Sequence, residues 1–346
     1  MNVKLKEITI MENIIKYINI HNFKSISNLK LEDCRRINLF IGYPNVGKSN
    51  VLEALSLFSL PYLSEGENIN KFIRTENKNE LFFDNRINSC FVTDDISTVE
   101  LNPNSFVVRH EYIGVEKQFF LSPKMNLTKR TESNIDDGED YWSTSVKKYT
   151  FSTNPSWLSN DDISLSQPNG ENIVNVLSYN PDLSEVLEWI KKEFFKYKLE
   201  LVLDISSNSL KVQQRLDGDK VKQLPYSSIA DTLQRVIFYK IAIASNKNAV
   251  LLFEEPEAHA FPPYIRNITQ DIIDAKTNQF FIVTHSPFIV NHFLEYADLR
   301  NEVAIYLFDF KNDQTTVKRL TDEEMDEVYN YDIDLFFNIE RFLRDE

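Results

Sequence analysis

The sequence predicts an α/β fold in which a mixed sheet carries a phosphate-binding loop. Three short apolar runs, at 36–41, 248–253 and 279–284, are typical of buried strands. The first run leads into a glycine loop and then into a segment, 50–58, whose apolar residues recur at helical spacing. Strand, glycine loop and helix in this order is the arrangement that phosphate binding requires.

The glycine loop is Gly42-Tyr43-Pro44-Asn45-Val46-Gly47-Lys48-Ser49, and it matches the pattern G-x-x-x-x-G-K-[S/T] at every fixed position. Its glycines allow backbone N–H groups to close around phosphate oxygens, and the following helix N-terminus adds positive potential. We expect Lys48 to reach the β- and γ-phosphates and the Ser49 hydroxyl to bind Mg²⁺. The alternative is a glycine turn that carries Lys-Ser by chance. The predicted nucleoside triphosphate contacts are Gly42, Asn45, Val46, Gly47, Lys48 and Ser49.

The composition is that of a folded chain whose surface is acidic. The 346 residues are 42% hydrophobic and 26% charged, and the formal net charge is −14. This charge argues against a surface that mainly coats DNA or RNA, although a local basic groove is compatible with it. Cys34 and Cys90 are too few for a disulfide framework or a zinc site, so we expect a reducing, cytoplasmic location. Polar residues and a proline interrupt the longest charge-free run, 277–294, so no membrane span is expected.

Two carboxylates follow the second buried-strand run. Glu254 and Glu255 come directly after Phe253, where a buried strand delivers its last residues to the carboxyl edge of the sheet. The phosphate loop opens at the same kind of edge. We therefore assign Glu254 to Mg²⁺ and Glu255 to activation of the attacking water. A solvated acidic strand end is the alternative interpretation.

The third buried-strand run is followed by His285. A histidine at this place is able to donate to the γ-phosphate, and we assign His285 that role, although a lone histidine is more often structural. Upstream, Ser228 and Asp231 form a Ser-x-x-Asp arrangement, which predicts a capped helix that runs to about Ala244. The same helix N-terminus is an anion site, which we expect to face the γ-phosphate of a second subunit.

Short strands separated by polar links dominate the chain after residue 61 and predict a β-rich insertion followed by a helical lobe. An amphipathic helix is expected at 181–198. An Asp217-Gly218 turn is expected to lead into a further strand. The strands before it are expected at 105–113, 117–121, 199–205 and 210–216, and the first two form a hairpin.

Three further segments have a predicted structure. The run 14–20 is typical of an edge strand, and the acidic stretch 131–145 of a solvated loop. A terminal helix is expected at 335–343. Its apolar residues exceed what a free helix needs, so it packs either on its own core or on a partner protein.

These motifs, in this order, resemble the ABC-type ATPase heads of the RecF, SMC and OLD (overcoming lysogenization defect) group, and most of all compact AAA-15 and AAA-21-like proteins. The resemblance covers roughly 12–60 and 170–310, and its most specific part is Glu254-Glu255-Pro256-Glu257-Ala258-His259. It implies nucleotide contacts from Lys24, Asn50 and Ser228 in addition to the phosphate loop. Family signature segments usually have glycine where Ala230 stands, and Gln118 is the candidate for the Gln loop. The matching segments are 22–25, 42–55, 227–231, 254–259 and 284–287.

The resemblance implies an ATPase lobe at 1–60 and 226–346, with an inserted β-rich and helical subdomain at 61–225. Two copies would enclose two ATP molecules with Mg²⁺, and Ser228 of each copy would complete the other copy's site. ATP binding would close this homodimer and hydrolysis would open it. We expect the motion to regulate a separate effector protein, a nuclease or a toxin, in anti-phage defence.

Two alternatives to the effector-regulating ATPase stay open. A RecF-like DNA-repair clamp would bind nucleic acid, which the negative net charge and the missing coiled-coil arm argue against. An OLD-type nuclease would need a further metal-binding domain, for which we expect the segment after His285 to be too short.

Overall fold

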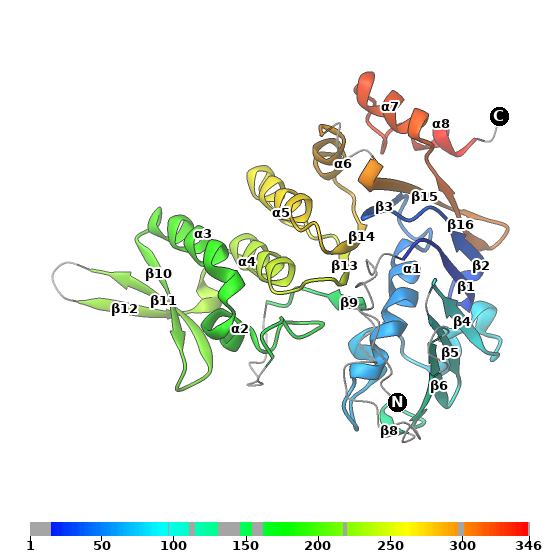
Figure 1. Ribbon diagram of the computed structural model, residues 1–346, viewed down its shortest axis with the longest axis horizontal. Helices are drawn as coiled ribbons and strands as arrows, with labels where there is room; N and C mark the ends of the chain where they lie inside the picture. The colour runs from blue at the N-terminus through cyan, green and yellow to red at the C-terminus, as the bar shows by residue number, and fades with distance from the viewer. Residues whose placement is uncertain are drawn as a thin grey trace, which may run out of the picture.

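The computed structural model describes residues 15–95, 97–110, 115–130, 146–153, 162–216, 220–296 and 301–344. Its helices and strands are arranged as Figure 1 shows. The strands are β1 (Ile18–Phe23), β2 (Ile26–Leu31), β3 (Ile37–Gly42), β4 (Cys90–Thr93), β5 (Ser97–Asn102), β6 (Ser105–His110), β7 (Val115–Leu121), β8 (Leu127–Arg130), β9 (Val146–Tyr149), β10 (Leu199–Asp204), β11 (Ser209–Arg215), β12 (Val221–Pro225), β13 (Val250–Glu254), β14 (Gln279–Val283), β15 (Val303–Lys311) and β16 (Gln314–Arg319). The helices are α1 (Lys48–Leu55), α2 (Ile173–Tyr179), α3 (Ser184–Phe195), α4 (Asp231–Ala244), α5 (Pro262–Asp274), α6 (Pro287–Leu294), α7 (Asp322–Asn330) and α8 (Ile339–Leu343).

A six-stranded mixed sheet forms the centre of the molecule, in the order β16-β15-β3-β14-β13-β9. Strand β3 is parallel to β14 and β15, β14 is parallel to β13, and β16 is antiparallel to β15. The α/β fold with a mixed sheet that was predicted from the sequence is therefore confirmed. Because β3, β14 and β13 are adjacent and parallel, their carboxyl ends meet at one edge, with Glu254 opposite Val283 and Val283 opposite Phe40.

Both faces of the central sheet are buried at β3, β13, β14 and β15, and alternate residues of these strands enter different cores. In β3, Leu39 and Ile41 belong to the core shared with α4, α5 and α6, whereas Phe40 belongs to the core that contains α1. Helix α1 contacts both the central sheet and β1 of the second sheet. In Figure 1, α1 lies between these sheets, and the yellow and orange helices lie on the other side. Burial on both faces explains why these strands are continuous apolar runs.

The second sheet is antiparallel and has seven strands in the order β2-β1-β4-β5-β6-β7-β8. It combines strands from both sides of residue 60, and β9 of the middle segment lies in the central sheet. The predicted β6–β7 hairpin is confirmed, with its link at 111–114 outside the described residues. The prediction of an edge strand near 14–20 was wrong. A tight turn at Lys24, where φ is +49°, folds β2 onto β1, so β2 takes the edge and β1 pairs with both β2 and β4.

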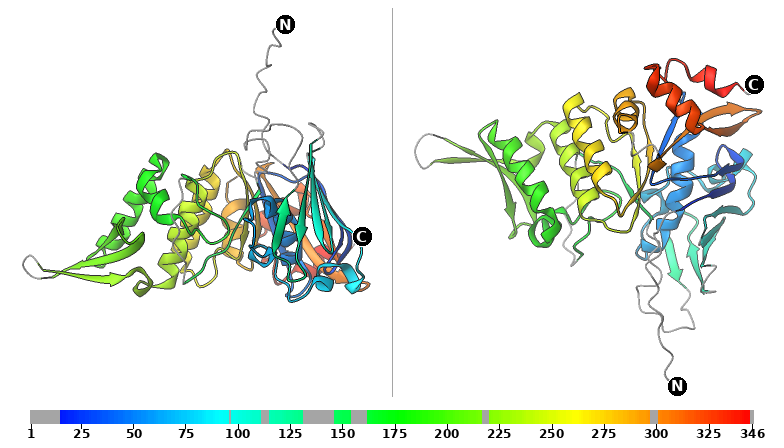
Figure 2. Two further views of the ribbon diagram at one scale, coloured as in Figure 1. Left: turned by 90° about the horizontal axis from the view of Figure 1, so that it is seen from below. Right: turned by 45° about the horizontal axis from the view of Figure 1, so that its top comes forward.

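Helices α2 and α3 and the three-stranded sheet β10-β11-β12 form a lobe at the far end of the molecule. Figure 2 shows the elongated shape, with this green lobe opposite the cyan second sheet. The amphipathic helix expected at 181–198 consists of a 3₁₀ turn, Pro181–Leu183, and α3. Strands β10 and β11 match their predicted positions. The Asp217-Gly218 turn and the acidic stretch 131–145 lie outside the described residues.

The C-terminal segment packs on the chain's own core. Leu335, Ile339 and Phe342 are buried in the core that contains α4–α6. The prediction that a helix begins at 335 was wrong, because the Asp334 carboxylate accepts hydrogen bonds from the backbone N–H groups of Phe336 and Phe337 and holds a turn there. Helix α8 begins only at Ile339. Within the described residues, no helix has both the length and the apolar character needed to cross a bilayer.

Candidate nucleotide site

The phosphate loop connects β3 to α1, and its glycines are required by the packing around it. Gly47 is the N-cap of α1 with φ +98°. A Cβ atom there would lie 2.0 Å from Oγ1 of Thr315 and 2.8 Å from Oγ of Ser25. At Gly42 a Cβ would lie 2.5 Å from the carbonyl oxygen of Phe308. The loop is therefore held closely against β15 and β16, and only glycine fits at these positions.

Lys48, the first residue of α1, is buried beneath the loop. Its Nζ donates hydrogen bonds of 2.8 Å to the carbonyl oxygens of Gly42 and Tyr43. Burial lowers the pKa of Lys48 to about 8, against the opposing effect of Glu255. Both hydrogen-bond acceptors are neutral, so the loop holds a poorly solvated ammonium group that an anion would stabilise.

The other loop residues have distinct environments. Val46 is buried in the core beside α1, and Asn45 is exposed with φ +64°. Ser49 lies half-buried in the first turn of α1. The Asn50 side chain donates a hydrogen bond of 2.7 Å to Oγ of Ser25. Asn50 therefore ties α1 to the β1–β2 turn, a contact that fixes the loop from the side.

Glu255 and His285 meet at the carboxyl edge of the central sheet. His285 Nε2 lies 3.6 Å from Glu255 Oε1, and the two side chains are 41% and 46% exposed. Burial and the nearby Lys48 ammonium lower the pKa of His285, and Glu255 opposes this effect. The Glu255 carboxylate likewise acts to raise the pKa of Lys48. The structure thus brings together the three groups, Lys48, Glu255 and His285, that were assigned separately from three parts of the sequence.

Glu254 is the last residue of β13 and forms an ion pair that the sequence did not predict. Its Oε1 lies 3.0 Å from Nη2 of Arg74, whose Nε also donates to Glu53 at 2.6 Å. Glu53 is buried in α1, and it forms a second ion pair with Lys24. Lys24 also donates to the carbonyl oxygen of Arg74 at 2.6 Å, so Lys24 lies in this network beside the site.

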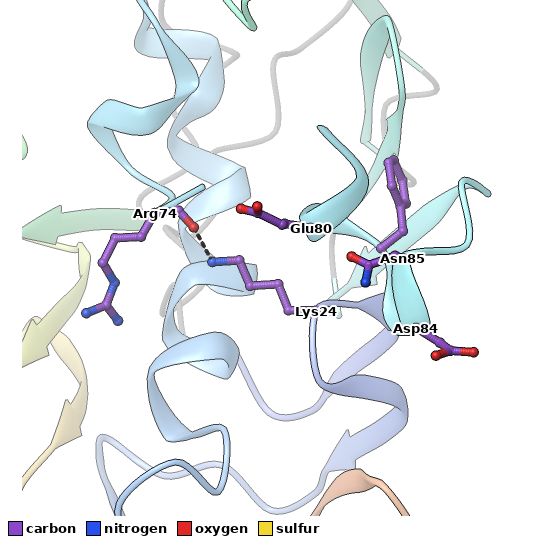
Figure 3. Close-up of a pocket in the computed structure, with 6 residues that line it drawn as sticks. Lys24, Arg74, Glu80, Asp84 and Asn85 are labelled. Atoms are coloured by element: carbon purple, nitrogen blue, oxygen red, sulfur yellow. Dashed lines mark hydrogen bonds between the residues drawn. The ribbon is translucent and has the colours of Figure 1, made fainter. Parts of the chain in front are cut away.

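An open pocket lies next to the Lys24 and Arg74 side chains. Figure 3 shows Lys24 extended toward the backbone of Arg74, with the Arg74 guanidinium group turned away from the pocket. Sequence reasoning missed Arg74 and Glu53. Arg74 belongs to no motif, and Glu53 has the spacing of an ordinary residue of α1, so neither carried a signal. The pocket is lined by Lys24, Arg74, Glu80, Phe82, Asp84 and Asn85.

Ser228 lies in a 3₁₀ turn, Tyr226–Ser228, before α4. The prediction that a serine caps this helix was wrong. Ala230 is the N-cap, and its methyl side chain has no polar atom to cap the helix, whereas Ser228 Oγ donates to the carbonyl oxygen of Pro225 at 2.7 Å. Helix α4 ends at Ala244, as predicted. Gln118, the Gln-loop candidate, lies in β7 of the second sheet and not in the central sheet.

The Ser49 hydroxyl in the first turn of α1 and the Glu254 carboxylate at the end of β13 are of the chemical type that would suit a magnesium ion shared with a nucleotide. Mg²⁺ in such sites keeps several waters and takes only one or two protein ligands besides the phosphates. The Ser49 hydroxyl and the Glu254 carboxylate are ligands of the preferred hard-oxygen type. In the part of the chain that the structure describes, three or more His, Cys, Asp or Glu side chains do not gather into a separate metal-binding group.

Comparison with known proteins extends this description. A family model described as "AAA domain, putative AbiEii toxin, Type IV TA system" matches residues 133–291, a segment that contains Glu254, Glu255 and His285. The ATP/GTP phosphatase of Helicobacter pylori is 23% identical over 332 residues, which are 82% of this chain and 88% of that protein. The DNA replication and repair protein RecF of Caldanaerobacter subterraneus subsp. tengcongensis is 24% identical over 119 residues, which are 32% of this chain and 33% of RecF.

Four of the curated relatives, RecF proteins among them, are matched over only 26% to 35% of their length. A solved SMC head bound to the C-winged helix domain of ScpA has the same fold, with a TM-score of 0.51 at 16% identity, and the match covers 90% of this chain and 99% of that chain. Together with the loop and strand-end geometry, these likenesses show that the chain resembles the ABC-type ATPases of the RecF/SMC group.

Proposed function

We propose that this chain binds ATP with Mg²⁺ and hydrolyses it to ADP and phosphate. The observation that carries the proposal is the convergence of Lys48, Glu255 and His285 beside the glycine loop, at one edge of the central sheet. The buried Lys48, whose pKa is lowered to about 8, lies near a solvent-accessible carboxylate and an imidazole. Such a combination of titratable groups is typical of a catalytic site, here one that acts on phosphate.

Each residue has a role that follows from its environment. Lys48 would exchange its carbonyl acceptors for β- and γ-phosphate oxygens, and loop N–H groups would bind the remaining oxygens. Ser49 and Glu254 would hold Mg²⁺, which neutralises developing charge on the phosphates. Glu255, 46% exposed, is accessible to the attacking water and would accept its proton. His285, whose pKa is lowered, stays neutral near pH 7 and would donate one ring N–H to the γ-phosphate.

We further propose that two copies enclose the nucleotides and that closure regulates a separate effector protein, a nuclease or a toxin, in anti-phage defence. Ser228 and the first turn of α4 would meet the γ-phosphate of the second copy. The likeness to a family described by a toxin and a type IV TA system supports the defence role. The likeness to RecF supports an alternative, a DNA-repair clamp for which nucleic acid is the partner.

The ATPase proposal is tested with Lys48→Ala and Glu255→Gln, each matched with an exposed control of the same chemistry, Lys191→Ala or Glu188→Gln on α3. Lys48→Ala is expected to bind ATP weakly. Glu255→Gln is expected to bind ATP normally, to lose about a hundredfold or more in kcat, and to accumulate as a dimer by light scattering. Unchanged hydrolysis in Glu255→Gln would require a different general base.

The two partner classes are separated by adding duplex DNA and, in another arm, the product of the neighbouring gene. Stimulation of ATP turnover by the neighbouring protein alone supports effector regulation. Stimulation by DNA alone supports the clamp. Incubation with plasmid, RNA or tRNA is the remaining arm. Cleavage that disappears on mutating an acidic pair outside the nucleotide site would favour a nuclease over both.

A further inference from the structure

We propose that Glu257 is a positioning residue that holds His285 in place for its contact with the γ-phosphate, by accepting hydrogen bonds from the end of the neighbouring strand. The inference rests on the proposed function, because it concerns the same site. In this proposal Glu257 does not contact the nucleotide itself and instead fixes the position of His285, which does.

The topology of the central sheet brings Glu257 to His285. Strands β13 and β14 are parallel, and Glu254 is opposite Val283. After β13 the chain turns back, with hydrogen bonds of 3.0 Å from Ala258 N–H to the carbonyl of Glu255 and 2.8 Å from Ala260 N–H to the carbonyl of Glu257. The third residue beyond Glu254 therefore lies beside the residues that follow Val283.

One carboxylate oxygen of Glu257 joins two consecutive residues at that strand end. Its Oε1 accepts a hydrogen bond of 2.6 Å from the Thr284 hydroxyl and one of 2.9 Å from the backbone N–H of His285. Thr284 is fully buried, and its Oγ1 accepts in turn from the Ser286 backbone N–H at 3.0 Å. The backbone on both sides of the His285 side chain is thereby fixed from one point.

The second carboxylate oxygen of Glu257 makes this arrangement costly for stability. Within the described residues, Glu257 Oε2 is buried and has no hydrogen-bond partner. Burial raises the pKa of Glu257, although the hydrogen bonds from Thr284 and from the His285 N–H oppose this effect. A buried carboxyl group with one unsatisfied oxygen is costly, and such groups are concentrated where function requires them.

The same turn is also attached to α4. The Thr232 hydroxyl, in the first turn of α4, donates a hydrogen bond of 2.6 Å to the carbonyl oxygen of His259. The turn 256–259 is thus hydrogen-bonded to α4 through His259 and to the residues after β14 through Glu257. A displacement of the turn would move His285 relative to Lys48 and Glu255, with which it shares the site.

The proposal is tested with Glu257→Ala and Glu257→Gln, with Glu188→Ala on the exposed surface of α3 as the matched control. Glutamine keeps a carbonyl oxygen that accepts both hydrogen bonds, and alanine removes it. We expect Glu257→Ala to lose about 10- to 100-fold in kcat, as a displaced catalytic contact does, with the KM for ATP changed by less than about twofold. Glu257→Gln is expected to retain kcat within about threefold of wild type.

A second readout does not depend on turnover. The pKa of His285 is measured by NMR titration of its ring signal, which is identified by its loss in His285→Asn. Burial and Lys48 lower this pKa, and Glu255 opposes them. Releasing the backbone in Glu257→Ala is expected to raise the pKa toward the ordinary value of about 6.5. Removing a carboxylate charge alone would lower it, and Glu257→Gln controls for that effect.

An unchanged His285 titration together with unchanged kcat in folded Glu257→Ala would overturn the proposal. Equal losses in the Gln and Ala variants would overturn it too, because charge rather than the acceptor would then be required. If Glu257→Ala does not fold, Glu257→Asp withdraws the oxygen by about one C–C bond length, and wild-type behaviour there would count against the proposal. If the wild type does not hydrolyse ATP, the proposed function fails, and the titration still decides whether Glu257 holds His285.

Discussion

ATP binding is expected to take up a proton at alkaline pH, because Lys48 loses its proton readily in the free protein. Burial lowers its pKa to about 8, from an ordinary value of 10.5, with Glu255 opposing the shift. Its ammonium group has the carbonyl oxygens of Gly42 and Tyr43 as acceptors. Phosphate oxygens in their place would favour the charged form and raise the pKa again.

The size of the effect follows from this pKa. With a value of about 8, about half of the Lys48 side chains are charged at pH 8 and about a tenth near pH 9. If nearly all are charged in the complex, binding takes up about 0.1 proton at pH 7, about 0.5 at pH 8 and about 0.9 near pH 9. The Lys48 side chain is mostly charged below pH 8, so the affinity for ATP is highest below pH 8. Above pH 8 the affinity falls by about tenfold for each pH unit.

Calorimetry measures this uptake when a non-hydrolysable ATP analogue is titrated in two buffers of different ionisation enthalpy at each pH. Lys48→Arg is the control, because arginine stays charged throughout the range. An affinity that does not change between pH 7 and about pH 9, or a proton uptake equally large in Lys48→Arg, would refute the reasoning.

Three further predictions concern neighbouring groups. Gly47→Ala places a Cβ 2.0 Å from Thr315 Oγ1 at φ +98°, so we expect a loss of about 2 to 5 kcal/mol in the free energy of unfolding, measured by urea denaturation. Glu254→Gln is expected to raise the Mg²⁺ concentration needed for half-maximal hydrolysis, measured by magnesium titration, and an unchanged requirement would contradict the metal assignment. Glu53→Gln breaks buried ion pairs and is expected to cost about 3 to 5 kcal/mol. Burial acts to raise the pKa of Glu53, but Lys24 and Lys148 hold it below the usual range. Its contribution is therefore complete at neutral pH and is lost as the pH falls through the lowered pKa, so the acid limb of the stability profile should flatten in the variant.

The central sheet and the convergence of its strand ends were predictable because they depend on local patterns. Buried strands leave continuous apolar runs, and parallel order follows when helices separate them. Once Phe253 and Val283 are the last buried residues of adjacent strands, Glu255 and His285 have to lie close together, as the structure shows.

Features that depend on distant partners were not predictable. Arg74 reaches Glu53 and Glu254 from a segment without regular pattern, and a sequence does not distinguish a buried carboxylate in α1 from an exposed one. The place of β1 inside the second sheet depends on its pairing with β4, which is separated from β1 in the sequence by β2, β3 and α1. Ala230 is the helix cap and Ser228 donates backward to the carbonyl oxygen of Pro225, a choice between two local geometries that residue type alone leaves open.

The two strand-end glutamates occupy different environments, which gives their assigned roles a physical basis beyond their order in the chain. Glu254 is 22% exposed and lies 3.0 Å from a guanidinium nitrogen of Arg74, so its carboxylate already faces a cation. Glu255 is 46% exposed, and the imidazole of His285, whose pKa is lowered, lies 3.6 Å from its carboxylate. A ligand for Mg²⁺ has to remain ionised and directed at positive charge, whereas a general base needs access to water and freedom to accept a proton. Because Arg74 keeps its 2.6 Å contact with Glu53, it is able to yield Glu254 to a metal ion without becoming unpaired.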